Sequence, residues 1–131
     1  MSKKASKKPK RAATRKKPAE RGIPKLRISF GEGLILGPGK VDLLEAISRT
    51  GSISAAGREM GMSYRRAWLL VDELNRMFSE PIVVASTGGS HGGGAALTDF
   101  GRDIAAAYRR AEQRTLVAVR EELGPFDKGA R

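Results

Sequence analysis

Short alternating stretches and longer helical repeats divide this chain into predicted elements. Apolar and polar residues alternate over 26–30, which is typical of a half-buried strand, and 34–36 allows a second short strand. The glycines and proline of 37–40 predict a turn that separates these strands from the first helix. That helix is predicted over about 40–49, closed by Thr50-Gly51, from the apolar spacing of Val41, Leu44 and Ile47.

Two more helices come next, separated by a glycine turn. Ser52 is a suitable N-cap for a short helix, and Ser63 is one for a longer helix over about 63–78. Gly61 supplies the backbone freedom of a tight turn between them. This order is the layout of a helix-turn-helix motif. An ordinary corner between two helices of a small helical protein has the same pattern.

The helix over 63–78 has an apolar face and a mainly polar face. The apolar face consists of Ala67, Leu70, Val71, Leu74 and Phe78, and the opposite face consists of Arg65, Leu69, Asp72 and Arg76. Tyr64 lies in the first turn, with Arg66 and Trp68 on the flanks. Recognition helices contact DNA bases from their N-terminal end, and arginine can bridge two guanine acceptors. A solvated helix face is the alternative for the arginines, and partial burial in the core is expected for Trp68.

Strand signals at 81–85 and 95–97 enclose a glycine-rich loop. After a helix-turn-helix motif, this pair of strands predicts a wing, and a plain flexible hairpin is the alternative. Backbone N–H groups of such a loop can approach phosphates. The loop has no G-x-G-x-x-G sequence and no following lysine, so it is not a nucleotide-binding loop. We expect His91 to be exposed and to bind no metal.

Thr98 is the expected cap of a final helix over about 99–123, which Gly124-Pro125 ends. Its apolar stripe consists of Phe100, Ile104, Ala107, Ala111 and Ala118, widened by Tyr108, Thr115 and Val119. A helix of this length extends about 37 Å, farther than the rest of a small domain covers. A homodimer would bury the outer half of the stripe. The residues expected at the dimer interface are Ile104, Tyr108, Ala111, Thr115 and Val119. A frayed or solvated helix is the alternative.

Charge is concentrated at the start of the chain. The 131 residues hold 25 Lys and Arg against 14 Asp and Glu, a formal net charge of +11. Residues 1–21 alone carry ten of the bases and one acid. We therefore expect a disordered basic leader over 1–22, one domain over 23–124 and a short tail over 125–131. The leader is either an arm that binds polyphosphate or a solubilising tail.

The composition disfavours most enzymes and metal proteins. The chain has no Cys and one His, so disulfides, thiolate metal sites and cysteine nucleophiles are excluded. No apolar run approaches the ~20 residues of a membrane span. The positive charge favours a polyanionic partner, and nucleic acid is the commonest one. We expect no catalytic residue, no metal and no cofactor.

Several short motifs give the chain a family resemblance over about 25–123. They are Gly51-Ser52-Ile53-Ser54, Gly61-Met62-Ser63-Tyr64, Ala67-Trp68, Asn75, Met77, Thr87-Gly88-Gly89, Gly92-Gly93-Gly94, Leu97-Thr98 and Gly101. In this order and spacing they resemble the N-terminal DNA-binding domain of the ModE family, the molybdate-responsive regulators. The segment from Leu97 to Gly101 also resembles the wider LysR-type winged helix.

The resemblance implies a mostly α fold with a small amount of β-structure. It would be a winged helix-turn-helix with a long C-terminal dimerisation helix, binding double-stranded operator DNA as a homodimer. The DNA-binding candidates, from the pattern and the resemblance together, are Ser52, Ser63, Tyr64, Arg65, Arg66, Leu69, Arg76, Gly89, Ser90 and His91. The family's wing tends to carry Lys where Ser90-His91 stand, so the basic leader is a candidate to compensate.

We therefore expect a sequence-specific transcriptional regulator of the bacterial cytoplasm, associated with the nucleoid. The alternative is a general nucleoid-associated or RNA-binding protein that relies on its leader. ModE proteins usually continue into molybdate-binding domains, and this chain stops at Arg131. We accordingly expect a stand-alone regulator that does not bind molybdate itself.

Overall fold

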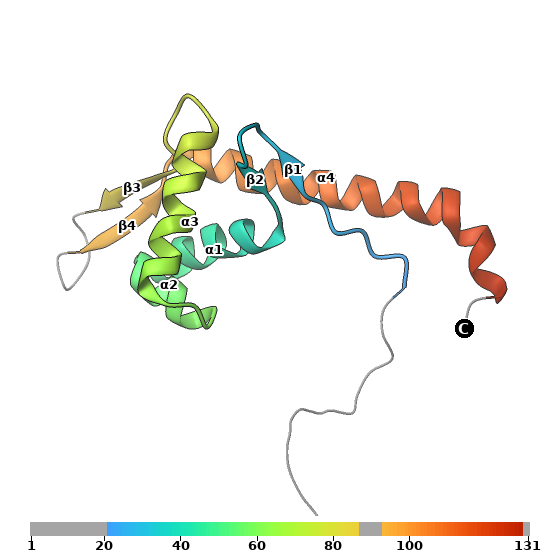
Figure 1. Ribbon diagram of the computed structural model, residues 1–131, viewed down its shortest axis with the longest axis horizontal. Coiled ribbons are helices and arrows are strands. Elements are labelled where there is room, and N and C mark those ends of the chain that lie inside the picture. Colours follow the sequence, from blue (N-terminus) through green and yellow to red (C-terminus); the bar gives the residue numbers. More distant parts are fainter. Residues whose placement is uncertain (1–20, 87–92, 130–131) are drawn as a thin grey trace, which may run out of the picture.

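The computed structural model describes residues 21–86 and 93–129. Its elements, in chain order, are β1 (Ile28–Ser29), β2 (Ile35–Leu36), α1 (Pro38–Thr50), α2 (Ile53–Glu59), α3 (Tyr64–Met77), β3 (Val83–Ser86), β4 (Gly94–Leu97), α4 (Asp99–Leu123) and the 3-10 helix η1 (Gly124–Gly129). The predicted helices and strands are all present, and the mostly helical winged helix-turn-helix class is confirmed. Figure 1 shows a compact body from which α4 extends.

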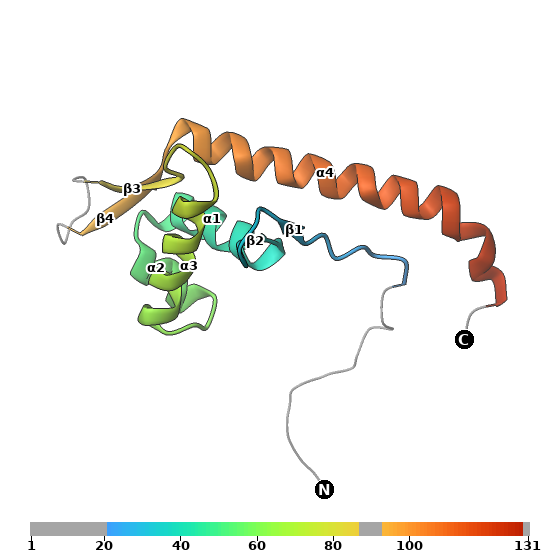
Figure 2. The same cartoon turned by 45° about the horizontal axis from the view of Figure 1, so that its top comes forward.

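The strands form two separate antiparallel hairpins. In the first hairpin, β1 pairs with β2, with Ile28 opposite Leu36. In the second, β3 pairs with β4, with Val83 opposite Leu97. The two hairpins lie on opposite sides of α3 in both views (Figures 1 and 2). The β3–β4 hairpin is the wing, and α3 therefore has one hairpin on each flank.

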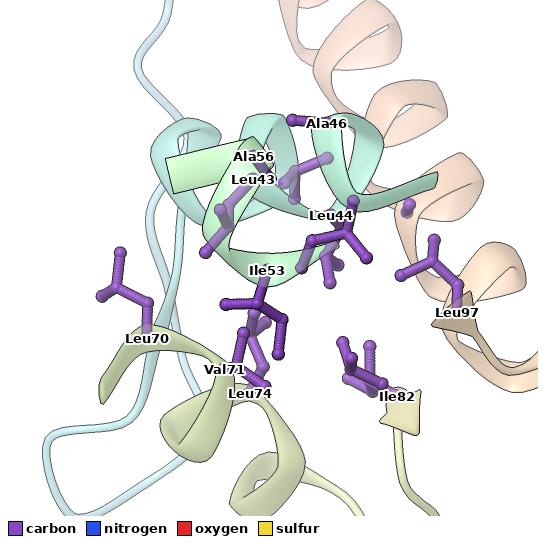
Figure 3. Packing of buried hydrophobic residues seen from close by; sticks show 14 of the residues in the cluster. Leu43, Leu44, Ala46, Ile53, Ala56, Leu70, Val71, Leu74, Ile82 and Leu97 are labelled. Atoms are coloured by element: carbon purple, nitrogen blue, oxygen red, sulfur yellow. The ribbon is translucent and has the colours of Figure 1, made fainter. Parts of the chain in front are cut away.

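The core is apolar and centred on α1. Six large side chains are fully buried: Val41, Leu43, Leu44, Ile47, Leu74 and Ile82. Figure 3 shows Leu43 and Leu44 of α1 facing Val71 and Leu74 of α3, with Ile82 from the base of the wing beside them. Each such burial contributes about 1.5–3 kcal/mol before entropy is counted. The core thus fixes α3 and the wing relative to α1.

The start of α1 differs from the prediction. The glycines and proline of 37–40 were expected to form only a turn, but α1 begins at Pro38. The proline ring already holds a helical φ, and the first N–H of a helix has no partner to lose. At the other end, Gly51 takes the left-handed conformation (φ 75°) and its N–H donates to the Ile47 carbonyl, which ends the helix as predicted.

The predicted N-caps are confirmed. The side-chain oxygen of Ser52 accepts from the N–H of Ala55, and that of Ser63 accepts from the N–H of Arg66. The hydroxyl of Thr98 accepts from the N–H of Gly101. Each bond satisfies a donor that the helix leaves free, and loss of such a cap costs about 1 kcal/mol.

The base of the wing is bound to α3 by one amide side chain. Asn75 accepts from the N–H groups of Ile82 and Val83 and donates to the Val83 carbonyl. On the α4 side, a Cβ atom at Gly101 would lie 2.3 Å from the Ile82 carbonyl oxygen. The chain therefore needs glycine there, because α4 starts against the backbone of the wing.

An arginine joins α4 to α1. The guanidinium of Arg109 bonds Asp42 at 2.6 Å and Glu45 at 2.9 and 3.0 Å, both on α1, and Glu112 at 2.9 Å on α4 itself. The hydrogen bond from Arg109 holds the pKa of Glu45 below its ordinary value. The same bonds raise the pKa of Arg109. The ion pairs of Arg109 thereby hold the first half of α4 on α1.

The segment 21–26 lies beside α4, a contact that the sequence pattern did not predict. The Tyr108 hydroxyl donates to the Leu26 carbonyl at 2.6 Å, and Arg21 bonds Asp127 at 2.7 Å. Tyr108 is only 3% exposed. Its own chain therefore leaves little of the Tyr108 side chain for a partner, and its assignment to the dimer interface stays a prediction.

The expected bounds of the leader, 1–22, and of the tail, 125–131, stay predictions. Near them the structure shows one contact, between Arg21 and Asp127. Asp127 belongs to η1, which covers Gly124–Gly129. The rest of the leader, 1–20, lies outside the described residues.

Candidate nucleic-acid interface

The helix α3 divides into a buried face and an outer face, close to the predicted division. Its buried residues are Ala67, Leu70, Val71, Leu74 and Met77. Phe78 was placed on this face, but it is the residue that ends α3. Its ring meets those of Phe30 and Phe100 edge-on, with centroids 4.7 and 5.7 Å away. Phe78 therefore packs beside the main core, where the hairpin β1–β2 and α4 meet.

The outer face carries two exposed arginines in the first turn of α3. Arg65 and Arg66 are both exposed, and neither forms an ion pair within the described residues. Arg76, at the far end of the helix, forms an ion pair with Asp72, with Nε of the arginine 3.1 Å from Oδ2 of the carboxylate. Free positive charge is thus concentrated at the N-terminal end of α3, where recognition helices contact bases.

Aromatic and aliphatic side chains complete the outer face. Tyr64, Trp68 and Leu69 are 62%, 46% and 48% exposed, and the rings of Tyr64 and Trp68 meet edge-on at 6.1 Å. Trp68 was expected in the partial core, but it lies on the outer surface. There it lines a crevice of about 260 Å³ between α3 and the wing, together with Val84 and Ile53. Such rings can contact sugars or base methyl groups.

Of the other predicted DNA-binding residues, two are helix caps and three lie outside the described residues. Ser52 and Ser63 are the caps of α2 and α3, and Ser63 lies beside the arginines. Gly89, Ser90 and His91 lie outside the described residues. The structure thus brings Ser63, Tyr64, Arg65, Arg66 and Leu69 to one end of one helix.

The hairpin β1–β2 contributes cations that the sequence pattern did not single out. Lys25 and Arg27, which come just before β1, line a second cleft on the other flank of α3, and Arg66 lines the same cleft. The alternating pattern of 26–30 did put Arg27 on the polar side of its strand. The pattern alone does not tell which element that side faces.

Within the described residues there is no cluster of His, Asp and Glu side chains suited to a metal ion. No helix in the same part of the chain is long and apolar enough to cross a membrane.

Residues 39–102 match the family model of the bacterial regulatory helix-turn-helix proteins of the lysR family. This range runs from the first turn of α1 to the first turn of α4, and so includes the core, α3 and the wing. Curated relatives extend the match along the chain.

The chain is 46% identical over 96 residues to the molybdenum-pterin-binding protein MopB of Rhodobacter capsulatus, covering 73% of this chain and 34% of that protein. It is 42% identical over 114 residues to the molybdenum transport protein ModE of Azotobacter vinelandii, covering 85% and 42%. For the DNA-binding transcriptional dual regulator ModE of Escherichia coli K12 the identity is 35%, with coverage of 63% and 32%. The chain thus spans between 32% and 42% of these relatives' length.

Residues 39–102 are thus similar to the regulatory helix-turn-helix proteins of the lysR family, and this match agrees with the winged helix-turn-helix fold. The chain is also similar to the MopB, ModE and MopA proteins over 72–85% of its own length, and the resemblance noted in the sequence is confirmed. No finding favours the alternative of a general nucleoid-associated or RNA-binding protein.

Proposed function

We propose that this chain binds double-stranded DNA at specific sites and regulates transcription, with α3 in the major groove. The observation that carries the proposal is the pair of exposed arginines in the first turn of α3, neither of which forms an ion pair with any residue of 21–86 or 93–129. Arginine reads guanine through its O6 and N7 acceptors, and a helix enters the groove with this end first. Tyr64 and Leu69 then lie toward bases or sugars on the same face.

The wing supplies contacts on one flank of the groove. Asn75 holds the base of the wing on α3, so the hairpin and the recognition helix move together. Gly89, Ser90 and His91 remain candidates for phosphate contact at its tip. Acting on the chromosome, such a regulator would work in the bacterial cytoplasm as a non-enzymatic protein.

A homodimer through α4 belongs to the same proposal. With Tyr108 covered by its own chain, the candidate interface lies farther out, around Ala111, Thr115 and Val119, which are half-buried. Val117 and Leu123 are 47% and 59% exposed on the same half of the helix. Two such helices side by side would remove apolar surface from water and place two copies of α3 on successive half-sites.

The test is selection of bound duplexes from a random library, followed by footprinting. A regulator of this kind protects a two-fold site with half-sites about one helical turn apart. Arg65→Ala would lose preference at one base pair of each half-site. Uniform protection of all duplexes, unchanged by Arg65→Ala, would instead favour the general nucleic-acid-binding alternative.

The basic leader is proposed as a sequence-independent arm. Because Arg21 already bonds Asp127, removal of 1–20 leaves that contact in place. The truncated chain would keep its preferred site and its melting temperature, but it would bind every duplex less tightly and with a flatter salt dependence. An unchanged salt dependence would mean that the leader is only a solubilising tail.

The expectation that the chain does not bind molybdate stays a prediction. Calorimetric titration of the full chain with molybdate tests it directly. Saturable heat at micromolar concentrations would contradict it.

A further inference from the structure

A second concave surface lies on the flank of α3 that faces away from the wing. This cleft has a volume of about 570 Å³ and lies between the hairpin β1–β2, the first turn of α1, the α2–α3 turn and α3 itself. In Figure 1 the same side of α3 carries β1 and β2, while the wing lies on the opposite side. The two concave surfaces therefore border the recognition helix on both flanks.

The cleft is strongly cationic. Its lining includes Lys25, Arg27, Lys40 and Arg66, against one acid, Glu73. Lys40 bonds Glu73 at 2.9 Å and donates to the Ile35 carbonyl at 2.6 Å, so these two charges neutralise each other.

Three cations in the cleft remain without a counter-charge. Lys25, Arg27 and Arg66 are exposed, and none of the three forms an ion pair within 21–86 and 93–129. By contrast, Arg49, Arg76 and Arg109 each have a carboxylate partner. Uncompensated cations that share one concave surface attract an anionic partner.

The backbone adds to this field. The first turn of α1 lines the cleft, and its N-cap, Gly37, offers no side-chain acceptor. A Cβ atom at Gly37 would lie 3.6 Å from Cγ of Arg27, so the stem of Arg27 passes over the start of α1. The partial positive charge of a helix N-terminus has the same sign as the three side chains.

From this arrangement we infer that the cleft binds backbone phosphates of the duplex whose major groove receives α3. The inference rests on the proposed function, since Arg66 belongs both to α3 and to the cleft. The phosphate backbones border the major groove, which is about 12 Å wide, on both sides. With the wing at one backbone, the cleft lies on the side of the other.

A row of backbone phosphates suits this surface better than one small oxyanion. Lys25, Arg27 and Arg66 come from the hairpin and from α3, and all three are exposed rather than gathered around a buried point. Successive phosphates present their charges in a row, and exposed cations displace counterions from such a row. These contacts carry no base preference, so they set affinity and register.

The double variant Lys25→Ala/Arg27→Ala tests the inference on the full chain. The matched control is Arg110→Ala/Arg114→Ala, which removes two exposed cations of α4. Binding to the selected duplex is measured between 50 and 200 mM salt. Each lost phosphate contact flattens the plot of log affinity against log salt by about 0.9, so the cleft variant should flatten it by one to two and the control should not. Base preference should stay as in the wild type, and hydroxyl-radical protection should shrink at one backbone beside each half-site.

The outcomes separate this inference from the proposed function. An unchanged salt dependence and footprint in the cleft variant would overturn the phosphate cleft, whereas the site preference and the effect of Arg65→Ala would stand. If the cleft variant has a lower melting temperature than the wild type, a second variant, Lys25→Arg/Arg27→Lys, is measured. It keeps both charges and should have the salt dependence of the wild type. Stabilisation of the free protein by inorganic phosphate, lost in the cleft variant without any change on DNA, would assign the cleft to a free oxyanion and overturn the duplex assignment.

Discussion

The arginines of α3 and those of α4 are held in opposite ways. At the start of α3, Arg65 and Arg66 are exposed and have no carboxylate partner within the described residues. On α4, Arg109 is two-thirds buried and is bonded by Asp42, Glu45 and Glu112. Arginine is thus available for a ligand on α3 and joins two helices on α4. The difference depends on whether neighbouring elements supply carboxylates.

This contrast gives each helix a distinct expected role. Substitutions on the outer face of α3 should change binding without changing stability. Substitutions on α4 should change stability or assembly without changing which base is preferred. The following substitutions test whether the two roles are separate, and their expected effects differ in size.

The largest effect is expected from Ala111→Glu on the outer half of α4. An ion buried without a partner at the proposed dimer interface would cost several kcal/mol of association, so the variant should be monomeric. Light scattering measures this, and circular dichroism checks that the domain stays folded. The control is Ala106→Glu, at an exposed position of the same helix. A wild-type chain that is monomeric at tens of micromolar would refute the dimer.

Replacement of Arg109 by Met should destabilise the domain. It leaves three carboxylates of α1 and α4 without their shared cation and removes the ion pairs that join α4 to α1. We expect the free energy of unfolding to fall by about 1–3 kcal/mol, less than for a fully buried ion pair because the guanidinium is partly solvated. Urea denaturation measures the loss, and the preferred duplex should be the same as for the wild type. A changed base preference would break the proposed separation of roles.

Arg65→Ala should have the converse effect. At the selected site it should cost about 1–3 kcal/mol of binding and relax the preference at one base pair. Its melting temperature should equal that of the wild type, because the side chain makes no ion pair within the described part of the protein. Arg66→Ala should instead weaken binding to all duplexes alike, as expected for a phosphate contact. Equal binding of Arg65→Ala and wild type would mean that α3 is placed wrongly on the DNA.

The smallest effect concerns acid pH and Glu45. Its hydrogen bond with Arg109 holds the pKa of the folded state below the ordinary value, so the pairing stabilises the fold above the unfolded pKa, about 4.3. This stabilisation is lost as the pH falls through the lower pKa of the folded state. Because Glu45 is 44% exposed, we expect less than about 1 kcal/mol. The melting temperature of Glu45→Gln should lie below that of the wild type at pH 7, and the gap should close under acid conditions.

Much of the fold could be predicted because it is encoded locally. Ser52, Ser63 and Thr98 cap the helices they were expected to cap, since a cap needs only a side chain three residues from an N–H group. The faces of α3 followed from helical periodicity, with Arg66 and Trp68 on its two flanks. Two residues were placed less well. The helix ends just before Phe78, and Trp68, which was expected in the partial core, is exposed.

The order of the elements, the helix caps and most of the outer face of α3 thus follow from local sequence. Three features depend on tertiary structure. Tyr108 is covered by its own chain, and Arg109 has carboxylate partners whereas Arg65 has none within the described residues. Lys25 and Arg27 line the same cleft as Arg66. The physical reason is range. Periodicity and capping act within a few residues, whereas burial and ion pairing depend on which distant segments the fold brings together, as with Tyr108 and Leu26, 82 positions apart.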